Sequence, residues 1–304
     1  MDTKSKIILI FGPTASGKSN FAIKVAKKID GEIVNADSMQ IYNQLNILTA
    51  RPKKKDEKKI KHHLYGFLSV KKNFSTGIWL KHAMRKINEI RERKKIPILV
   101  GGTGLYFKSI TEGLVKMPNI PSRFRNKMRA LQKKIGQKKF YQKLTKVDPL
   151  VKNKINSNDV QRSIRAFEIK KFTKLSITQW FKKTKILFKS DNFIKIYIDF
   201  PRDELVERIK ERVERMFHNG AIEEVKKYNK IKVKSENSSN KVIGIEEVGK
   251  YLEGELDLRQ TKEIIFIKTR QYAKRQTTWA RGQMGSWQKI SPQDLKKYLK
   301  KIKL

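Results

Sequence analysis

Residues 7–19 read IILIFGPTASGKS, and this stretch decides the fold. An uninterrupted apolar run that ends at a turn is typical of a buried strand, which we expect over Lys6–Phe11. Gly12–Ser19 follows directly and fits the pattern G-x-x-x-x-G-K-[ST]. Behind this loop, apolar residues recur at helical spacing, which predicts an amphipathic helix over Ser16–Ile29. The succession of strand, glycine-rich loop and helix predicts the first unit of a parallel α/β sheet.

The same alternation of strands and helices occurs before and after the middle of the chain. Apolar runs predict three further strands, at Glu32–Ala36, Ile96–Val100 and Phe193–Phe200. Helical spacing predicts long helices at Gly77–Lys95, Asp203–Phe217 and Thr261–Trp279. Because strands that are separated by helices pair in parallel, we predict an α/β fold with one parallel sheet and flanking helices.

The middle of the chain has a different character. It contains no strand-like run, and its basic helical segments are Arg123–Ile135, Gln137–Leu144, Asp159–Thr173 and Thr178–Phe181. We therefore expect residues 1–114 and 191–304 to form the α/β domain with its C-terminal helices, and residues 115–190 to form an inserted all-helical domain. The part after Pro201 is expected to be mostly helical, with a polar loop at Lys232–Lys241.

The charge of the chain is strongly positive. Its 304 residues include 71 Lys and Arg against 29 Asp and Glu, a formal charge of +42. Such an excess favours a polyanionic partner, above all nucleic acid, because basic side chains neutralise phosphates and release counterions. Compositional drift is the alternative, since only 17 of the basic residues are Arg and many lysines stand in runs such as Lys53–Lys55. Charge alone leaves both interpretations open.

Composition excludes several kinds of site. The chain contains no Cys, which rules out disulfides, thiolate nucleophiles and cysteine-ligated zinc. Its four His disfavour a histidine-rich metal site, and His62 and His63 are interpreted as structural because adjacent positions of a helix do not face one ion. The mean hydropathy is −0.62, and no apolar run approaches the length of about 18 residues that a membrane span needs. We therefore expect a cytoplasmic protein without a membrane partner.

The loop Gly12–Ser19 predicts a binding site for a diphosphate or triphosphate. Its glycines let backbone N–H groups curl around phosphate oxygens, and the following helix N-terminus adds partial positive charge. Lys18 would contact the outer phosphate, and the Ser19 hydroxyl would hold Mg²⁺. The pattern does not identify the molecule that carries the phosphates.

Two polar residues follow predicted strands at the edge of the sheet where ligands bind in parallel α/β folds. Asp37 comes after Glu32–Ala36, and its carboxylate would bind a metal through water or accept a proton as a general base. A helix N-cap is the alternative role for this residue. Thr103 comes after Ile96–Val100, and its hydroxyl would bond a phosphate oxygen or simply close a turn.

Two basic clusters bear on the partner. Gln161–Arg165 (QRSIR) lies on a predicted helix that carries Arg162 and Arg165 on one face. Lys274–Arg281 (KRQTTWAR) combines basic residues with Trp279, a pairing suited to phosphate contacts and base stacking. A solvated basic helix face is the alternative for either cluster.

Six blocks of sequence together carry a family resemblance. In chain order they are Gly12–Ser19, Ala36–Tyr42 (ADSMQIY), Thr49–Pro52 (TARP), Val100–Tyr106 (VGGTGLY), Asn158–Glu168 (NDVQRSIRAFE) and Lys274–Arg281. With these blocks the sequence resembles the bacterial tRNA dimethylallyltransferases (tRNA isopentenyltransferases) of the IPP transferase family, over nearly the whole chain. The resemblance implies a P-loop NTPase-like fold with an inserted helical domain that binds tRNA.

The resemblance also implies an activity. Members of this family transfer a dimethylallyl group from dimethylallyl diphosphate to N6 of the adenine 3′-adjacent to the anticodon and release diphosphate. Their substrates are tRNAs that read codons beginning with U. The glycine-rich loop would then hold dimethylallyl diphosphate in place of ATP. We expect a monomer that binds the anticodon stem-loop and uses Mg²⁺.

Particular residues receive roles through the resemblance. Asp37 corresponds to the general base, Lys18 and Thr103 to groups that bind the diphosphate, and Arg125 to a further position near the reacting groups. The donor would lie on the loop residues Gly12, Pro13, Thr14, Ala15, Ser16, Gly17, Lys18 and Ser19, with Mg²⁺ at Ser19. The implied tRNA contacts are Asp37, Ser38, Met39, Gln40, Thr103, Arg125, Gln161, Arg162, Ser163, Ile164, Arg165, Lys274, Arg275, Gln276, Thr277, Thr278, Trp279, Ala280 and Arg281.

Some features depart from the family pattern, and other functions stay open. Ser19 stands where many relatives have Thr, and residues 117–125 (MPNIPSRFR) match more loosely than the other blocks. A P-loop kinase of nucleotides or small molecules would use the same loop for ATP, would carry a pair of lid arginines and would not need Lys274–Arg281. An adenylate-type isopentenyltransferase would not need a large basic insert. A non-enzymatic RNA-binding protein would leave Asp37 unexplained.

Overall fold

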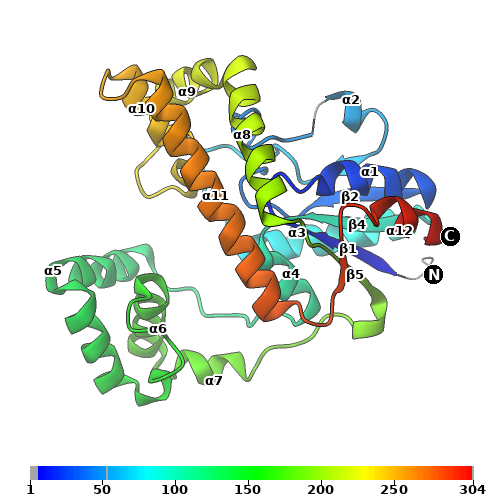
Figure 1. Ribbon diagram of the computed structural model, residues 1–304. Coiled ribbons are helices and arrows are strands. Elements are labelled where there is room, and N and C mark those ends of the chain that lie inside the picture. The colour runs from blue at the N-terminus through cyan, green and yellow to red at the C-terminus, as the bar shows by residue number, and fades with distance from the viewer. Residues whose placement is uncertain (1–5, 53, 303–304) are drawn as a thin grey trace. The chain divides into compact units, whose positions relative to one another are not determined.

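The computed structural model describes residues 6–52 and 54–302 (Figure 1). The chain divides into two compact units, of which the first is Met1–Thr111 with Phe188–Leu304 and the second is Glu112–Leu187. The first unit contains the sheet, and the second, all of whose residues are described, is built from helices. Within the two described ranges, no helix has the length and apolar character needed to cross a membrane.

A six-stranded parallel sheet forms the centre of the first unit. Its strands are β1 (Ile7–Phe11), β2 (Gly31–Asn35), β3 (His62–His63), β4 (Ile96–Gly101), β5 (Phe193–Ile198) and β6 (Gln288–Ile290). β1, β2 and β4 are buried along their whole length, and accordingly β1 and β4 are nearly continuous apolar runs, whereas β2 (GEIVN) also carries the buried polar residues Glu32 and Asn35. The predicted parallel α/β architecture is confirmed.

The strand order places the candidate site. Across the sheet the order is β3-β2-β4-β1-β5-β6, so β1 lies between β4 and β5 (Figure 1). In register, Ile8 pairs with Ile98 on one side and with Ile194 on the other. Parallel sheets bind ligands at the carboxyl ends of the strands, beside the point where the order reverses. The loops that follow β1, β2 and β4 all lie at this edge.

Helices of varied length complete the first unit. They are α1 (Lys18–Lys28), α2 (Lys54–Glu57), α3 (Thr76–Glu92), α4 (Gly104–Thr111), α8 (Arg202–His218), α9 (Ala221–Lys230), α10 (Ile245–Leu252), α11 (Leu258–Gln283) and α12 (Leu295–Lys301), with 3-10 turns at Ser190–Asn192 and Ser238–Lys241. The long helix α11 packs against α8 and α10 (Figure 1). α11 also contacts α4 and so connects the C-terminal helices to the sheet region.

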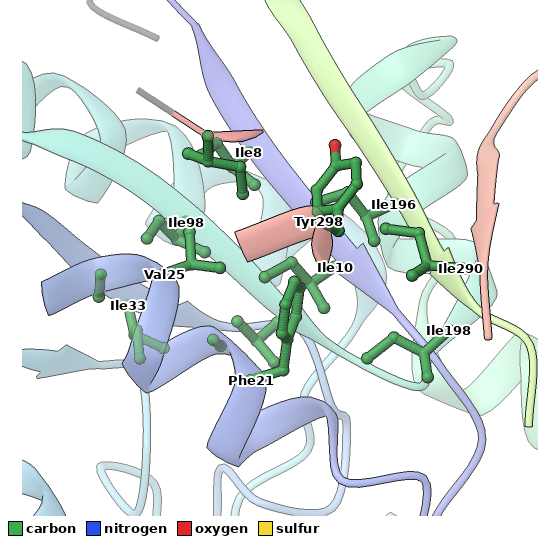
Figure 2. Packing of buried hydrophobic residues seen from close by; sticks show 14 of the residues in the cluster. Ile8, Ile10, Phe21, Val25, Ile33, Ile98, Ile196, Ile198, Ile290 and Tyr298 are labelled. Carbon is green, nitrogen blue, oxygen red and sulfur yellow. The ribbon is translucent and has the colours of Figure 1, made fainter. Parts of the chain in front are cut away.

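Two apolar clusters hold the first unit together. In the first, Phe21 and Val25 of α1 pack over Ile10 of the sheet and Tyr298 of α12, and the rings of Phe21 and Tyr298 lie 6.4 Å apart (Figure 2). Fully burying one such side chain stabilises the fold by about 1.5–3 kcal/mol. The second cluster joins residues 41–48 to α8, α9, α10 and α11. It therefore anchors the segment that follows Asp37.

The second unit is a small helical bundle. It consists of α5 (Ser122–Val147), a 3-10 turn (Pro149–Val151), α6 (Val160–Thr173) and α7 (Ile177–Phe181). α5 is interrupted at Gly136, whose φ is 75°, and the break falls between the two helices that the sequence predicts there. The Asp159 side chain caps α6 by accepting a hydrogen bond from the Arg162 N–H (2.9 Å). Phe140 and Phe167 meet in its core with ring centroids 5.1 Å apart.

One local expectation is wrong, and two others hold with a short element added to each. His62–His63 forms the edge strand β3 and is not helical, and β6 is a strand in a region expected to be mostly helical. The polar segment Lys232–Lys241 ends in a 3-10 turn that holds buried Asn237 and Ser239, and both side chains donate to the Val70 carbonyl oxygen (3.2 and 2.8 Å). These short elements depend on partners far away in the sequence, so they cannot be predicted from their own residues.

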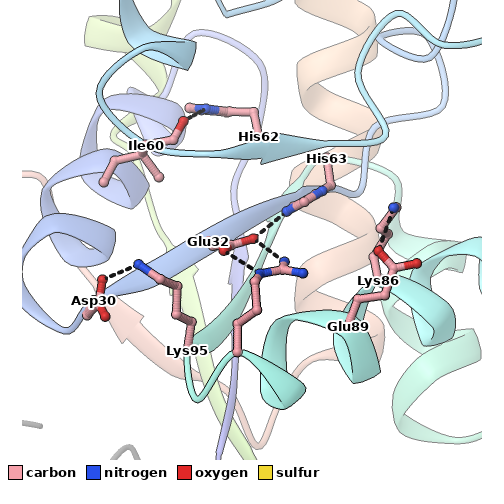
Figure 3. A network of polar contacts seen from close by, with 9 residues as sticks. Asp30, Glu32, Ile60, His62, His63, Lys86, Glu89 and Lys95 are labelled. Atoms are coloured by element: carbon pink, nitrogen blue, oxygen red, sulfur yellow. Dashed lines mark hydrogen bonds and ion pairs between the residues drawn. The ribbon is translucent and has the colours of Figure 1, made fainter.

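A buried ionic network accounts for the second of the two adjacent histidines, His63 (Figure 3). Glu32, only 3% exposed in β2, contacts His63 Nε2 at 2.6 Å and accepts two hydrogen bonds from the Arg93 guanidinium (3.1 and 2.7 Å). Burial raises the pKa of Glu32, but the bonds from Arg93 and His63 outweigh it and lower the pKa overall. Burial lowers the pKa of His63, and Glu32 opposes that shift. His63 thus serves as a partner that pairs β3 with β2.

Candidate active site

The glycine-rich loop between β1 and α1 forms the floor of the candidate site. A Cβ on Gly12 would lie 2.7 Å from Ser16 Oγ and 3.3 Å from Ile198 Cβ, so only glycine fits there. Ser16 Oγ is buried and has no hydrogen-bond partner among the described residues. Ser19, by contrast, is exposed in the first turn of α1. The buried Ser16 hydroxyl is therefore left available to an anion on the loop.

Lys18 is half-buried beside this loop, and its Nζ donates to the Pro13 carbonyl oxygen at 3.3 Å. Burial lowers the pKa of Lys18 to about 8; the Asp37 carboxylate opposes this shift, and the Arg212 guanidinium adds to it. A cation whose charge is disfavoured in this way gains from the arrival of a polyanion. The loop thus combines donors and a cation that suit a diphosphate.

Arg212 is a site residue that sequence reasoning missed. It comes from α8, and its Nη1 donates to Thr14 Oγ1 of the loop at 2.8 Å. Its Nε is buried without a partner among the described residues, and burial lowers its pKa while Asp37 raises it. Arg208, one turn earlier, is exposed and lies 4.9 Å above the Phe200 ring. In the sequence both look like ordinary members of a charged helix, so nothing local distinguishes them.

Asp37 lies at the end of β2 in a tight turn. Its Oδ1 accepts a hydrogen bond from the Met39 N–H (2.9 Å), and its own N–H donates to Asn35 Oδ1 (2.8 Å). No helix begins at this residue, so the N-cap alternative is wrong. The turn occupies one carboxylate oxygen, while no hydrogen bond of the described residues reaches Oδ2. Asp37 therefore has one oxygen fixed and one available.

The surroundings of Asp37 are phenols and cations from distant segments. Burial raises the pKa of Tyr65, Tyr106 and Tyr272, and in each case the Asp37 carboxylate adds to the rise. Lys18 and Arg212 are the positive groups that interact with it. The negative charge of Asp37 therefore interacts with two positive side chains, and the neighbouring phenols stay neutral.

Thr103 fastens the end of β4 to the Asp37 turn. Its Oγ1 accepts from the Ser38 N–H at 2.9 Å and lies 3.3 Å from Ser38 Oγ, and its own N–H donates to the Ala36 carbonyl oxygen (3.2 Å). Thr103 therefore does more than close a turn, because its side chain bonds the residue that follows Asp37. These bonds hold Asp37 and Thr103 side by side.

Gln276 of α11 joins two loops of the site. Its Oε1 accepts from the Thr14 N–H, and its Nε2 donates to the Gly102 carbonyl oxygen, both at 2.8 Å. A Cβ on Gly102 would collide with this amide, which explains the glycine. Gln276 is 5% exposed, so α11 supplies a rigid bridge between the phosphate loop and the Thr103 loop.

Comparison with known proteins identifies the family that has this arrangement of residues. The model of the IPP transferase family matches residues 40–283. A tRNA dimethylallyltransferase of Pelagibacter ubique (strain HTCC1062) is 59% identical over 303 residues, which cover 100% of this chain and 97% of that protein. This chain belongs to the IPP transferase family. A tRNA dimethylallyltransferase of Rickettsia massiliae (strain Mtu5) is 43% identical, over 92% of this chain and 78% of its own length.

Solved structures agree with the family. A tRNA isopentenylpyrophosphate transferase from Bacillus halodurans is 32% identical with a TM-score of 0.70, and the match covers 98% of this chain and 94% of that one. A eukaryotic dimethylallyltransferase acting on tRNA is 29% identical with a TM-score of 0.82, over 96% of this chain and 75% of its own. The resemblance and the P-loop NTPase-like fold that it implied are confirmed.

The implied tRNA contacts of this IPP transferase family member separate into accessible and inaccessible groups. In the second unit Gln161 and Arg162 are exposed and Arg165 is half-buried, but Ser163 and Ile164 are buried and face the core. The helix turns these two side chains inward, and their implied contact with tRNA stays a prediction. Arg125 is half-buried in the same unit, whereas Asp37, Lys18 and Thr103 lie in the first unit.

The C-terminal cluster separates in the same way. Lys274, Arg275, Thr278 and Arg281 are exposed, and Thr277 is half-buried. Gln276 and Ala280 are buried, and their implied contact with tRNA likewise stays a prediction. Trp279 is half-buried, with its indole N–H packed against Gly104 and without a partner among the described residues. The Trp279 indole therefore packs at the start of α4, next to Thr103.

Proposed function

We propose that this chain is a tRNA dimethylallyltransferase. It would transfer the dimethylallyl group from dimethylallyl diphosphate to N6 of the adenine 3′-adjacent to the anticodon in tRNAs that read codons beginning with U. The observation that carries the proposal is the position of Asp37: a carboxylate with one unbonded oxygen follows β2 at the edge of the sheet that carries the phosphate loop, where its charge interacts with those of Lys18 and Arg212. A proton acceptor next to a diphosphate site is what N-alkylation by an allylic diphosphate requires.

The loop would assist the departure of diphosphate. As the carbon–oxygen bond breaks, negative charge grows on the leaving diphosphate, where Lys18, Arg212 and loop N–H groups stabilise it. The allylic carbon tolerates the matching positive charge, so this bond can loosen early. The Thr14 N–H is already bonded to Gln276 and the Ser16 N–H to the Pro13 carbonyl oxygen, so the Ser16 hydroxyl and the remaining loop N–H groups would meet the phosphate oxygens.

Asp37 would receive the proton. The adenine N6 is a weak nucleophile because its lone pair is delocalised into the ring, so it attacks only as the diphosphate leaves. The new bond joins N6 to the allylic carbon, and the surplus N6 proton passes to the free Asp37 oxygen. The Met39 N–H on the other oxygen holds the carboxylate in orientation, and Thr103 fixes the turn next to it.

Mg²⁺ fits this site only together with a bound diphosphate. Among residues 6–52 and 54–302 no group of three His, Asp or Glu side chains is placed to hold a metal ion. The Ser19 hydroxyl is exposed at the loop, and Asp37 is the carboxylate at the same edge of the sheet. One or two protein oxygens plus phosphates are sufficient for Mg²⁺, which keeps several waters. When bound, the ion would neutralise charge on the leaving diphosphate.

The second unit supports tRNA as the acceptor. Residues 112–187 contain 21 Lys and Arg against four Asp and Glu, and the Arg162 and Arg165 side chains are 66% and 31% exposed. A free adenine nucleotide offers too few phosphates to need such a surface, whereas an anticodon stem-loop offers many. Lifting the adenine out of its stack costs a few kcal/mol, which phosphate contacts would offset. A tRNA substrate also places the protein in the cytoplasm, and we infer that it acts there as a monomer.

One feature of the structure favours the kinase alternative, and another opposes it. Arg208 and Arg212 lie one turn apart beside the loop, as a kinase would arrange a pair of arginines. Of these two arginines, only Arg212 donates a hydrogen bond to the loop. If Asp37 activated a small phosphoryl acceptor, the basic second unit would have no explanation. The family membership favours prenyl transfer.

One assay tests the proposal. The purified protein is incubated with Mg²⁺ and dimethylallyl diphosphate in parallel with three acceptors: unmodified tRNA with A-A-A across the last anticodon base and the next two, AMP, and ATP with small phosphoryl acceptors. We expect prenylated adenine in the tRNA and no product in the other tubes. Prenylation of AMP without prenylation of tRNA, or phosphoryl transfer alone, would contradict the proposal.

A further inference from the structure

The second unit contains an acidic residue that its basic surface does not explain. Of its four Asp and Glu, Asp159 caps α6 and Glu168 is buried on the same helix. A carboxylate in a unit that binds an anion weakens the attraction, so its presence calls for a compensating role. The contacts of Glu168 show what that role is.

Glu168 is shared by two arginines. Its Oε2 lies 3.2 Å from Arg165 Nη1 and 3.6 Å from Arg125 Nε. The glutamate side chain is 3% exposed, whereas those of Arg125 and Arg165 are 41% and 31% exposed. The carboxylate is therefore a buried anchor, and both guanidinium groups extend from it to the surface.

The anchor connects two helices. Arg125 lies in the first turn of α5, and Arg165 lies on α6 three residues before Glu168. Arg125 Nε is buried and forms no hydrogen bond with the described residues, so charge attraction to Glu168 is what aligns this group. Its two terminal nitrogens remain available for a ligand with oxygen acceptors.

Alignment before binding matters for a long side chain. An arginine that is already ordered loses less conformational freedom when it grips a phosphate, so binding is tighter. Arg162 provides the contrast, since its partner Asp159 lies 3.4 Å away in an exposed ion pair and its side chain is 66% exposed. The block Gln161–Arg165 thus contains one largely exposed arginine and one that is held by a buried carboxylate.

We propose that Glu168 is a positioning residue that holds Arg125 and Arg165 for the phosphates of the RNA substrate. The inference rests on the proposed function, because it takes tRNA as the ligand of this unit. Glu168 itself touches no RNA; it acts through the two arginines. The negative charge of Glu168 by itself would weaken RNA binding, whereas its positioning of the two arginines would strengthen RNA binding.

The test uses this difference in sign. Glu168→Gln keeps the shape and makes the unit more positive, so charge alone would leave tRNA binding unchanged or tighten it. If Glu168 positions the arginines, the dissociation constant for unmodified tRNA rises about tenfold, as for loss of one hydrogen bond to a charged group. The slope of log K against log salt also becomes shallower by about 0.7–0.9, the value of one phosphate contact.

Two further variants separate positioning from charge and from folding. Asp159→Asn removes the same charge from the same helix, still caps it and leaves Arg165 held, so we expect no loss of affinity. Glu168→Asp keeps the charge but retracts the carboxylate, and it should weaken binding as Glu168→Gln does. If Glu168→Gln melts at a lower temperature than the wild type, the tRNA affinity of Glu168→Asp decides whether Glu168 positions the arginines. In an Arg125→Ala/Arg165→Ala background, Glu168→Gln should have no further effect.

The outcomes are distinct. Unchanged or tighter binding by Glu168→Gln, with an unchanged salt slope, overturns the inference. A full effect of Glu168→Gln in the double arginine background overturns it as well. Wild-type protein that binds tRNA but transfers no dimethylallyl group refutes the proposed function, while the binding comparison still decides the role of Glu168. Wild-type protein that does not bind tRNA refutes both.

Discussion

Replacing Gln276 tests how the two loops of the candidate active site are held. Gln276→Ala removes two hydrogen bonds of 2.8 Å, one from the Thr14 N–H and one to the Gly102 carbonyl oxygen. Both bonds are buried, so each group left without a partner costs about 1–3 kcal/mol. We expect the free energy of unfolding to fall by roughly 2–4 kcal/mol, which lowers the melting temperature by roughly 5–10 °C.

The ligand response of this variant has a definite direction. Without Gln276, the Thr14 N–H is free to donate to a phosphate oxygen, so a bound diphosphate replaces one of the lost bonds. Inorganic pyrophosphate with Mg²⁺ should therefore raise the melting temperature of Gln276→Ala by more than it raises that of the wild type. Differential scanning calorimetry with and without pyrophosphate measures both quantities.

A matched control lies on the same helix. Gln271 is exposed on α11, and Gln271→Ala should leave the melting temperature and its response to pyrophosphate unchanged. Melting of Gln276→Ala within about 1 °C of the wild type would show that Gln276 does not hold the two loops together, because the loss of buried bonds of this kind carries a larger cost. An equal pyrophosphate response in both proteins would show that the Thr14 N–H does not reach the ligand.

Further predictions concern the reacting groups and the pH dependence. Asp37→Ala should lower kcat by about 10²–10⁴-fold with little change in tRNA affinity, and near-wild-type turnover would remove Asp37 as the base. Arg212→Ala should raise KM for dimethylallyl diphosphate by about 10–100-fold, as for a lost hydrogen bond to a charged group, whereas Arg208→Ala should raise it less, because Arg208 lies near Gly17 but donates no hydrogen bond to the loop; equal effects would contradict the geometry. Because burial lowers the pKa of Lys18 to about 8, pyrophosphate affinity measured by calorimetric titration should fall as the pH rises through about 8, and Lys18→Arg should lose this dependence. The pKa of His63 lies below its ordinary value of 6.5, so the unfolded chain takes up a proton that the folded chain refuses and the free energy of unfolding falls below about pH 6.5; His63→Gln should show a smaller fall in urea titrations at pH 7 and pH 5.

Local sequence was sufficient for the parts of the fold whose partners are near in the chain. The run that ends at Phe11 and the loop behind it form strand and loop as predicted, and the break at Gly136 falls where two helices were expected. Asp37 and Thr103 could be placed together because parallel strands end at one edge of the sheet. In each case a pattern of a few residues fixes the backbone.

The site also contains groups that no local pattern marks. Gln276 is 262 positions from the loop residue it bonds, and Arg212 is 198 positions away. Both lie on helices most of whose other polar residues are exposed, so their environment appears only after α8 and α11 pack. β3 and β6 were missed for the same reason, since each is a short edge strand stabilised by its neighbour.

The sequence by itself determined the chemistry that is available: a phosphate loop, a carboxylate and a threonine at strand ends, and two arginine-bearing blocks in the order of one family. Tertiary structure decided which of these side chains can act. It turned Ser163, Ile164, Gln276 and Ala280 inward, brought Arg212 to the loop and placed Glu168 beneath two arginines. The physical reason is that burial and hydrogen-bond partners depend on the packing of distant helices, whereas a motif records only its own residues.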